Sequence, residues 1–335
     1  MRFRSAATGC LLLSVAAAAF GDDMRLGSAL LLVEPGQIAP VIDVRDVAAN
    51  GDAWNLGISG WTVTGELERP AERGRRFFVS VALTPYNAHS SRRVYRDGVR
   101  ARDLEFDSAE YSLRSGIRIR EGEHGTTELT ALLGREVIGS DAPVALRDAW
   151  QSPYAGVLWA QHYRRVTADD PFASRIHGVE LAMLAEVYTG KRTWSRITLS
   201  ETAGRPLGPF HLRQTAMVFA GSGLDRVSAF TMGGSWDVLG PTAVYGSHYA
   251  EYRPTRGIAV NGGADYAVTR TWEVGGRLSV FRAPSTTRKG AALQTTVHVG
   301  GLRFTAGGGL PLGGDGGNHR VVYMMVSAAG FERMN

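Results

Sequence analysis

The amino-acid sequence predicts an all-β fold, an antiparallel transmembrane β-barrel of about 12–16 strands. Segments in which apolar and polar residues alternate at period 2 recur along the chain. Several of them exceed the roughly five to six residues that are usual for strands of globular proteins. After residue 20, the longest wholly apolar run is 321–326, far shorter than the ~20 residues of a spanning helix. Since backbone groups must be paired inside lipid, a chain of this kind can cross a membrane only as a closed barrel.

The segment 256–282 shows the pattern most clearly, as two strands joined by a tight turn at 269–271. One face of this hairpin is apolar and carries Ile258, Val260, Tyr266, Val274, Leu278 and Val280. The other face is polar or small and carries Asn261, Asp265, Glu273, Arg277 and Ser279. About eleven residues at ~3.4 Å each, tilted about 40°, rise roughly 28 Å, which matches the apolar band of an outer membrane.

The chain begins with a predicted signal peptide, residues 1–21. Arg2 and Arg4 form its basic region, residues 10–20 form its apolar region, and small residues at 17–21 offer a cleavage site. The protein is therefore predicted to be exported to the outer membrane. Removal of the signal also removes Cys10, the only cysteine, which excludes disulfides and thiol chemistry in the mature chain.

Residues 22–53 are predicted to be a short periplasmic leader that could contribute a first strand, and residues 54–335 to be the barrel. Fourteen candidate strands follow the leader, two of them in the hairpin. They are 54–66, 76–84, 104–119, 126–138, 154–165, 176–188, 193–202, 210–220, 226–233, 243–252, 256–282, 291–305 and 320–331. Longer polar loops are expected at 87–102, 140–152 and 307–319, since bacterial barrels carry long loops on one rim.

Charged residues repeatedly occupy the face opposite an aliphatic stripe, and we predict that they line the lumen. The predicted lumen-lining residues are Glu110, Arg114, Arg118, Glu180, Glu186, Asp265, Glu273 and Arg277. Mixed charge of this kind would set ion preference through the local field.

Composition and motifs give little support to other chemistry. The formal net charge of +5 falls further when the signal is removed, so no nucleic-acid partner is expected. The glycine cluster at 307–317 lacks a Gly-Lys-Ser/Thr ending and is expected to be a flexible loop. The histidines show no metal-ligand spacing, so neither a metal nor a cofactor is predicted.

An enzymatic alternative stays open at this stage. Ser247-His248 and the pair His177 and Glu180 supply residue types that an outer-membrane lipid hydrolase or deacylase would use. No flanking motif singles out a nucleophile, so we expect that the protein is not an enzyme. A structural or adhesive barrel with a filled lumen is the other alternative.

Three short motifs carry a family resemblance. The sequence DDPFASRIHG at 169–178 resembles the strand entry of surface-antigen barrels of the BamA/TamA type, and FTMGG at 230–234 looks like their Phe-x-x-Gly-Gly element. The order of GGLRF at 300–304 and PLG at 311–313 before the last strand is similar to the close of that family. The resemblance covers about 169–331 and implies a barrel of this type, without POTRA domains.

The sequence also departs from this family. Its Arg-Gly-Tyr/Phe motif, on a loop that folds into the lumen, is replaced here by VLGP at 238–241 and VYG at 244–246. The chain ends FERMN rather than on an aromatic residue. These departures argue against insertase or translocase activity.

The prediction is therefore a Gram-negative outer-membrane protein, either a passive pore or a surface-antigen-like transport barrel. Its expected partners are outer-membrane lipid, lipopolysaccharide and, during biogenesis, the barrel-assembly machinery.

Overall fold

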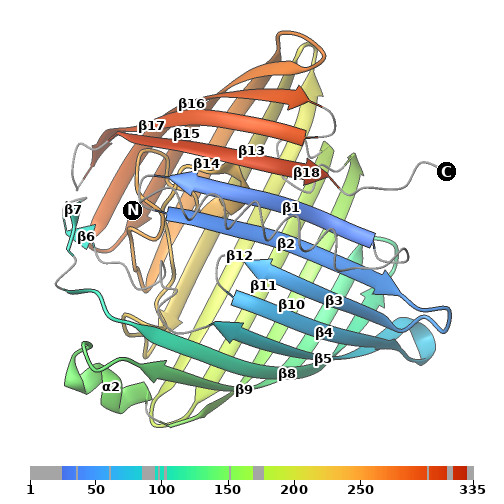
Figure 1. The fold of residues 1–335 in the computed structure, drawn as a ribbon, viewed down its shortest axis with the longest axis vertical. Helices are drawn as coiled ribbons and strands as arrows, with labels where there is room; N and C mark the ends of the chain where they lie inside the picture. Colours follow the sequence, from blue (N-terminus) through green and yellow to red (C-terminus); the bar gives the residue numbers. More distant parts are fainter. Residues whose placement is uncertain are drawn as a thin grey trace.

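The computed structural model describes residues 25–34, 37–59, 62–84, 95–96, 99–101, 104–150, 152–168, 177–299, 302–314 and 320–329. The predicted signal peptide lies outside this part of the chain, as do most of the 87–102 loop and most of the 169–178 motif. Within it, sixteen antiparallel strands form one closed barrel, in which the first strand pairs with the last (Figure 1). The predicted fold class is confirmed.

The barrel strands follow one another in chain order. The first eight are β1 (Arg25–Glu34), β2 (Gln37–Val47), β3 (Ala53–Ser59), β4 (Thr62–Pro70), β5 (Arg75–Thr84), β8 (Ser108–Glu121), β9 (Gly125–Ile138) and β10 (Tyr154–Ala168). The other eight are β11 (His177–Thr189), β12 (Thr193–Leu207), β13 (Phe210–Ser222), β14 (Arg256–Ala267), β15 (Trp272–Ala283), β16 (Thr286–Val299), β17 (Leu302–Gly314) and β18 (Val321–Ala329).

Four small elements lie in those parts of the connections that the structure describes. They are the two-stranded sheet of β6 (Tyr95–Arg96) and β7 (Val99–Arg100), the helix α2 (Val144–Trp150), and the 3₁₀ helices η1 (Glu72–Gly74) and η3 (Asp237–Thr242). No helix of the described residues combines the length and the apolar character that crossing a bilayer requires.

The barrel begins earlier than the sequence pattern predicts. Two strands, β1 and β2, lie within residues 22–53, and they close the barrel where a leader with one strand was expected. Pro40 obscures the pattern because proline cannot donate to a strand ladder. It faces Leu31 of β1, one residue beyond the last β2–β3 pair, Val41–Ser59. The missing N–H therefore costs no bond to β3.

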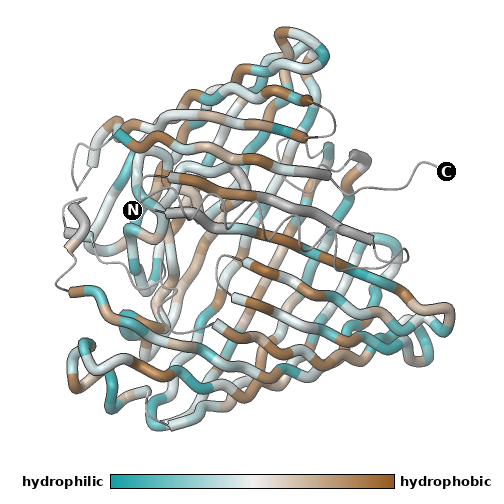
Figure 2. The backbone as a smooth tube through the Cα atoms, in the orientation of Figure 1, coloured by the Kyte–Doolittle hydropathy of each residue, from teal (hydrophilic) through white to brown (hydrophobic). Residues whose placement is uncertain are grey.

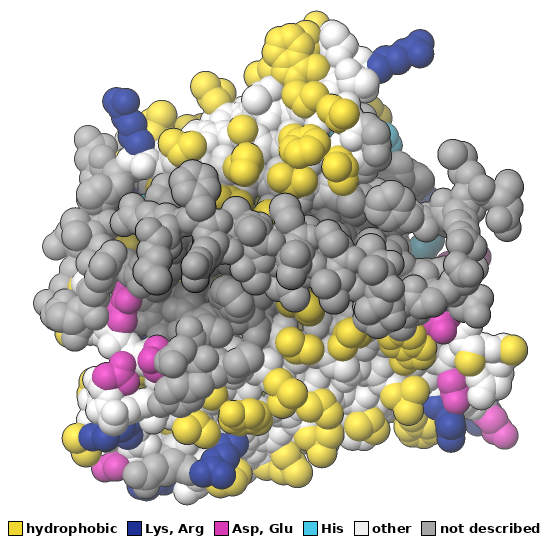
Figure 3. Space-filling view, in the orientation of Figure 1, with side chains coloured by type: hydrophobic (Ala, Val, Ile, Leu, Met, Phe, Trp, Pro, Cys, Tyr) yellow, Lys and Arg dark blue, Asp and Glu magenta, His cyan; other side chains and the backbone are white. Residues whose placement is uncertain are grey.

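More and less hydrophobic residues alternate along the strands (Figure 2), and in the hairpin their side chains lie on opposite faces of the wall, as its pattern predicts. In β14 and β15, Ile258 is 50% and Leu278 59% exposed, whereas Asn261 is 4% and Arg277 2% exposed. The exposed face is the outer face of the barrel. Figure 3 shows hydrophobic side chains spread over the visible outer wall, with charged ones gathered toward its ends. A wall of this kind is suited to contact with lipid.

The two rims differ. One rim carries the long connections 85–107, 139–153 and 223–255, with α2, β6 and β7, and we call it the long-loop rim (Figure 1). The opposite rim, the short-turn rim, carries compact turns such as 48–52, 122–124 and 268–271, and it is where β1 starts and β18 ends.

Three predicted segments are wrong. Residues 226–233 and 243–252 are not barrel strands but belong to the connection between β13 and β14. The glycine-rich stretch expected to be a loop continues as strand β17 to Gly314.

Candidate functional site: the barrel interior

The connection 223–255 folds back inside the barrel, and we call it the internal segment. Isolated bridges join Met232 to Tyr252 and Gly234 to Val244, so its two arms run antiparallel to each other. Asn261 of β14 donates from Nδ2 to the carbonyl of Gly240 at 3.0 Å. The backbone N–H of Tyr245 donates to Oγ of Ser279 on β15 at 3.0 Å. These bonds fix the segment against the inner wall.

Glycines in the wall allow this close approach. A Cβ on Gly290 of β16 would overlap the carbonyl of Tyr245. A Cβ on Gly309 of β17 would lie 2.6 Å from the backbone nitrogen of Gly246 and 2.8 Å from Oγ of Ser235. The segment thus rests on backbone that has no side chain in its path.

Two apolar clusters hold the internal segment in place. One packs Phe230, Met232 and Val244 against inner residues of β13–β15, and Val244 is fully buried. The other packs Trp236 and Tyr245 against Leu32, Ala292, Tyr323 and Met325. Because Leu32 is on β1 and Met325 on β18, the segment braces the closure of the barrel from inside.

Asp225 anchors the start of the internal segment to the long-loop rim. Its carboxylate accepts from the backbone N–H groups of Val227 at 2.9 Å and Ser228 at 3.0 Å. It also accepts from Nε1 of Trp150 in α2 at 2.9 Å and from Nη1 of Arg192 at 2.8 Å. Burial raises the pKa of this carboxyl, but hydrogen bonds led by those of Ser228 and Trp150 outweigh burial and leave the pKa lowered.

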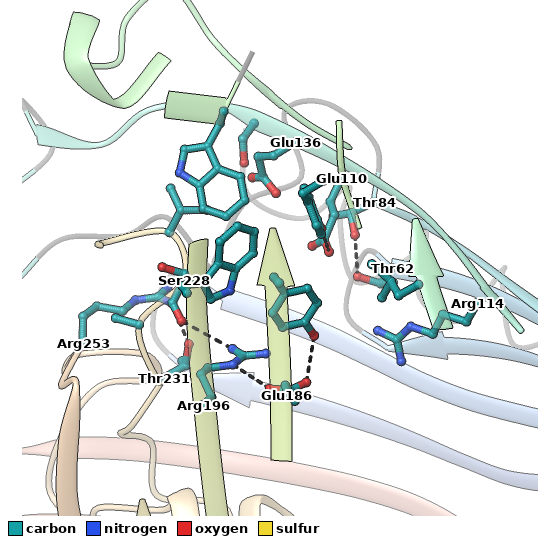
Figure 4. A pocket seen from close by; sticks show the side chains of 18 residues that line it. Thr62, Thr84, Glu110, Arg114, Glu136, Glu186, Arg196, Ser228, Thr231 and Arg253 are labelled. Carbon is teal, nitrogen blue, oxygen red and sulfur yellow. Dashed lines mark hydrogen bonds and ion pairs between the residues drawn. The ribbon is translucent and has the colours of Figure 1, made fainter. Parts of the chain in front are cut away.

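Trp150 and Ser228, which both donate to Asp225, also line a pocket of about 300 Å³, whose lining side chains are shown in Figure 4. The aromatic residues Trp150, Tyr154, Tyr188 and Trp194 form part of its lining. Its charged lining residues are Glu110, Arg114, Glu136, Glu186, Arg196 and Arg253. Arg196 donates from Nε to Glu186 at 2.6 Å, and the Tyr188 hydroxyl donates to the same carboxylate at 2.9 Å. The Tyr154 hydroxyl donates to Glu110 at 3.3 Å.

A second charged group lies nearer the short-turn rim. Arg118 of β8 donates to Glu66 at 2.6 Å, to Glu68 at 3.0 Å and to Glu128 at 2.7 Å. Its guanidinium also lies 4.2 Å from the ring centroid of Phe78. This one cation therefore links carboxylates from β4 and β9.

The predicted lumen-lining residues fall into separate groups. Glu110, Arg114 and Glu186 meet at the pocket, and Arg118 lies in the second group. The remaining four are paired with neighbours on the same wall. Arg277 donates to both oxygens of Asp265, at 2.7 and 2.9 Å, while Glu273 lies 3.4 Å from His298 and Glu180 lies 3.8 Å from Arg164. Their role in lining a conducting lumen stays a prediction.

Five further members of these groups were not predicted from the sequence, namely Glu66, Glu68, Glu128, Glu136 and Arg196. A signal for the first two was present. Val63, Gly65 and Leu67 alternate with Thr64, Glu66 and Glu68, but the predicted strand 54–66 spanned the break between β3 and β4. Arg196 and Thr198 alternate in the same way with the exposed Ile197 and Leu199.

The hydrolase candidates are engaged in other contacts. The hydroxyl of Ser247, a residue only 1% exposed, donates to the carbonyl of Val244. The His248 ring stacks on Tyr95 at 5.2 Å, and the His177 ring stacks on His211 at 5.2 Å. Among the described residues, no group of three or more His, Cys, Asp or Glu residues could hold a metal ion.

Comparison with known proteins gives similarity of fold. No family description matches the chain, and no curated protein sequence matches it. The barrel is similar to BamA from Haemophilus ducreyi lacking POTRA domains 1–3, with a TM-score of 0.69, 6% identity, and coverage of 93% of this chain and 71% of that one.

It is also similar to two CdiB proteins. For CdiB from Escherichia coli the TM-score is 0.59 and the identity 13%, with 93% and 63% of the two chains covered. For CdiB from Acinetobacter baumannii the TM-score is 0.59 and the identity 11%, with 93% of this chain and 60% of that chain covered. The chain thus spans less than two thirds of either CdiB. The predicted resemblance to BamA-type barrels is confirmed as a resemblance of fold.

Proposed function

We propose, from the barrel fold that this chain shares with BamA and CdiB, that it is a passive outer-membrane pore narrowed by its internal segment. The observation that carries the proposal is the division of the wall into an apolar outer face and a charged inner face. A barrel of this strand number is wide enough to enclose an aqueous channel, since porins with 16–18 strands do so. Charged groups on the inner wall keep such a channel hydrated and bias its ion preference.

The outer face supports placement in the outer membrane. β14 and β15 contain 12 residues each, and at ~3.4 Å per residue and a tilt of about 40° they rise roughly 31 Å. Leu293 is 71% and Val322 65% exposed on this face, which is unfavourable in water and favourable in lipid. Because bacterial barrels carry their long loops outside, the long-loop rim is placed at the cell surface.

The internal segment occupies one side of the lumen. Its middle packs on the wall formed by β13–β18 and β1, and its start packs against aromatic residues of β10–β12 and α2 near the long-loop rim. On the opposite wall, the side chain of Arg118 is 28% and that of Glu180 37% exposed. This uneven filling supports a narrowed passage rather than a filled barrel.

The test is conductance in a planar bilayer. The purified full-length protein is first shown to be folded by its faster electrophoretic migration before boiling, then added to the bilayer at low concentration. A second protein, in which 236–248 is replaced by a short Gly-Ser linker, is measured alongside. We expect discrete conductance steps for the natural protein and larger steps for the shortened one.

Two outcomes would overturn the proposal. If only the shortened protein conducts, the internal segment closes the barrel and the natural protein is not a passive pore. If neither protein conducts although both migrate faster before boiling (that is, both are heat-modifiable), the lumen is filled and the barrel serves a structural or adhesive role.

A further inference from the structure

Three cations lie together on the outer face at the long-loop ends of consecutive strands. Arg256 begins β14, Arg282 is near the end of β15, and Lys289 is near the start of β16, and all three are exposed. Ile258, two residues after Arg256 and 50% exposed, pairs with Arg282. Val280, 47% exposed, pairs with Lys289. Paired residues share a face, so these cations point toward lipid.

The register sets the spacing of this group, which we call the cation row. Arg282 faces Ile258, which places it diagonal to Arg256, and it also faces Thr287, which places it diagonal to Lys289. Diagonal neighbours have their Cβ atoms about 7–8 Å apart, within reach of long side chains. No ion pair joins any of the three to another residue of the described chain. Their mutual repulsion would be relieved by a bound anion.

An apolar groove lies directly beside the cation row, toward the middle of the wall. Its volume is about 590 Å³, and it crosses β14 to β17. Small residues that line it are Gly262, Gly276, Ala291 and Gly308, and large ones are Leu278, Leu293, Leu310 and Leu312. Ala291 is the next residue after Lys289 on the same face, so the groove starts about 7 Å from that cation.

We propose that the cation row and the groove together bind one phosphorylated, multiply acylated lipid of the outer leaflet. The phosphate contacts Arg256, Arg282 and Lys289, and an acyl chain lies in the groove. Arginine suits this role because its planar guanidinium binds phosphate oxygens in pairs. The order of the two features matches a lipid of the leaflet at the long-loop rim, with its headgroup outward and its chains toward the midplane. The proposal rests on the outer-membrane placement proposed above.

The first test uses native mass spectrometry of the purified protein in detergent, with bisphosphorylated lipid A as the probe. The variant R256Q/R282Q/K289Q removes the cation row. The control R135Q removes Arg135, an exposed arginine of β9 that follows the outward-facing Leu133 by two residues. Near an anionic lipid each basic residue contributes about fivefold in affinity, so we expect binding to fall about a hundredfold in the triple variant. The control should bind as the natural protein does.

The groove is tested separately by G276L. A Cβ at Gly276 would lie 3.9 Å from Cδ2 of Leu293, so the larger residue fits the fold while filling the groove. The control is G65L, because a Cβ at Gly65 of β4 meets nothing within 4 Å. We expect G276L alone to weaken lipid A binding, about tenfold for the loss of one acyl contact region.

The probes distinguish the sources of phosphate. We expect the natural protein to prefer lipid A over its dephosphorylated form and to be unaffected by millimolar inorganic phosphate. Equal binding of the two lipids would overturn the proposal, and so would displacement by free phosphate, which would indicate an anion site without a lipid. Heat-modifiability and recovery in the outer-membrane fraction are measured on the same samples. If the protein is not heat-modifiable or is not recovered in the outer-membrane fraction, the proposed placement is refuted. If both measurements are normal but the variants bind lipid A as the natural protein does, only this inference is refuted.

Discussion

Asp225 fixes the point where the internal segment enters the barrel, so its replacement should free that segment. In D225N, the amide can still accept from the N–H groups of Val227 and Ser228. In the natural protein the carboxylate accepts hydrogen bonds from Arg192 at 2.8 Å and from Trp150 at 2.9 Å. The NH₂ group of the asparagine cannot accept, so both hydrogen bonds are lost. A hydrogen bond to a charged group contributes about 1.5–3 kcal/mol, and because the Trp150 bond is only partly buried we count about 1 kcal/mol for it. The Arg192 side chain is 43% exposed, so we discount its part to about 1 kcal/mol.

The sum is about 2 kcal/mol, or roughly a thirtyfold rise in the population of the released segment. Trypsin can report this population, because Arg226 and Arg253 lie within the segment. When reclosing is fast, the cleavage rate follows the open population, so it should rise about thirtyfold. Mass spectrometry of the fragments identifies the sites. The control is D52N, which removes a carboxylate from a short turn on the other rim, where it accepts from Arg69.

The pH dependence follows from the lowered pKa of Asp225. A carboxyl whose pKa is lower in the folded protein contributes stability above its unfolded pKa of about 3.9, and this contribution is lost as the pH falls through the folded value. Hydrogen-exchange protection of the segment should therefore fall below about pH 4 in the natural protein and change less in D225N. Equal cleavage of D225N and the natural protein would show that packing around Trp236 and Val244, not this carboxylate, holds the segment.

Two further predictions concern the inner wall. Replacing Arg118 by glutamine leaves Glu66, Glu68 and Glu128 without their shared cation. We expect the free energy of unfolding in urea to fall by about 1–3 kcal/mol. We also expect the pore to become more selective for cations. Unchanged reversal potential under a salt gradient would contradict the second part. Replacing Gly309 by alanine places a Cβ 2.6 Å from the nitrogen of Gly246, so the segment must shift and the conductance steps should change in size. G308A is the matched control, because its Cβ meets only the carbonyl of Val321 at 3.9 Å, and an equal effect of both would refute the argument.

The candidate site was only partly predictable. Glu110, Arg114, Arg118 and Glu186 were found because each lies opposite aliphatic neighbours at period 2, which is a local property of one strand. Their partners come from strands distant in sequence, as when Arg118 meets Glu66 and Glu68. Such meetings depend on the register between strands, which no single strand records.

The internal segment was missed for a related reason. Phe230 and Met232 alternate with polar or small residues, as apolar residues do in a lipid-facing strand. Val244 fits the same pattern in the predicted strand 243–252. In the folded chain these side chains pack against the inner wall instead. Lipid and a packed wall both accept apolar side chains, so the pattern alone cannot tell one from the other.

The sequence by itself determined the barrel class and which face of the hairpin 256–282 is apolar, because alternation along one strand dictates which side can leave water. The tertiary structure decided the number of strands, the closure of β1 on β18, and the folding of 223–255 into the interior. It also decided that Arg256, Arg282 and Lys289 gather above one groove. These features depend on hydrogen bonds and close contacts between segments that lie far apart in the chain. They are therefore defined only in the closed barrel.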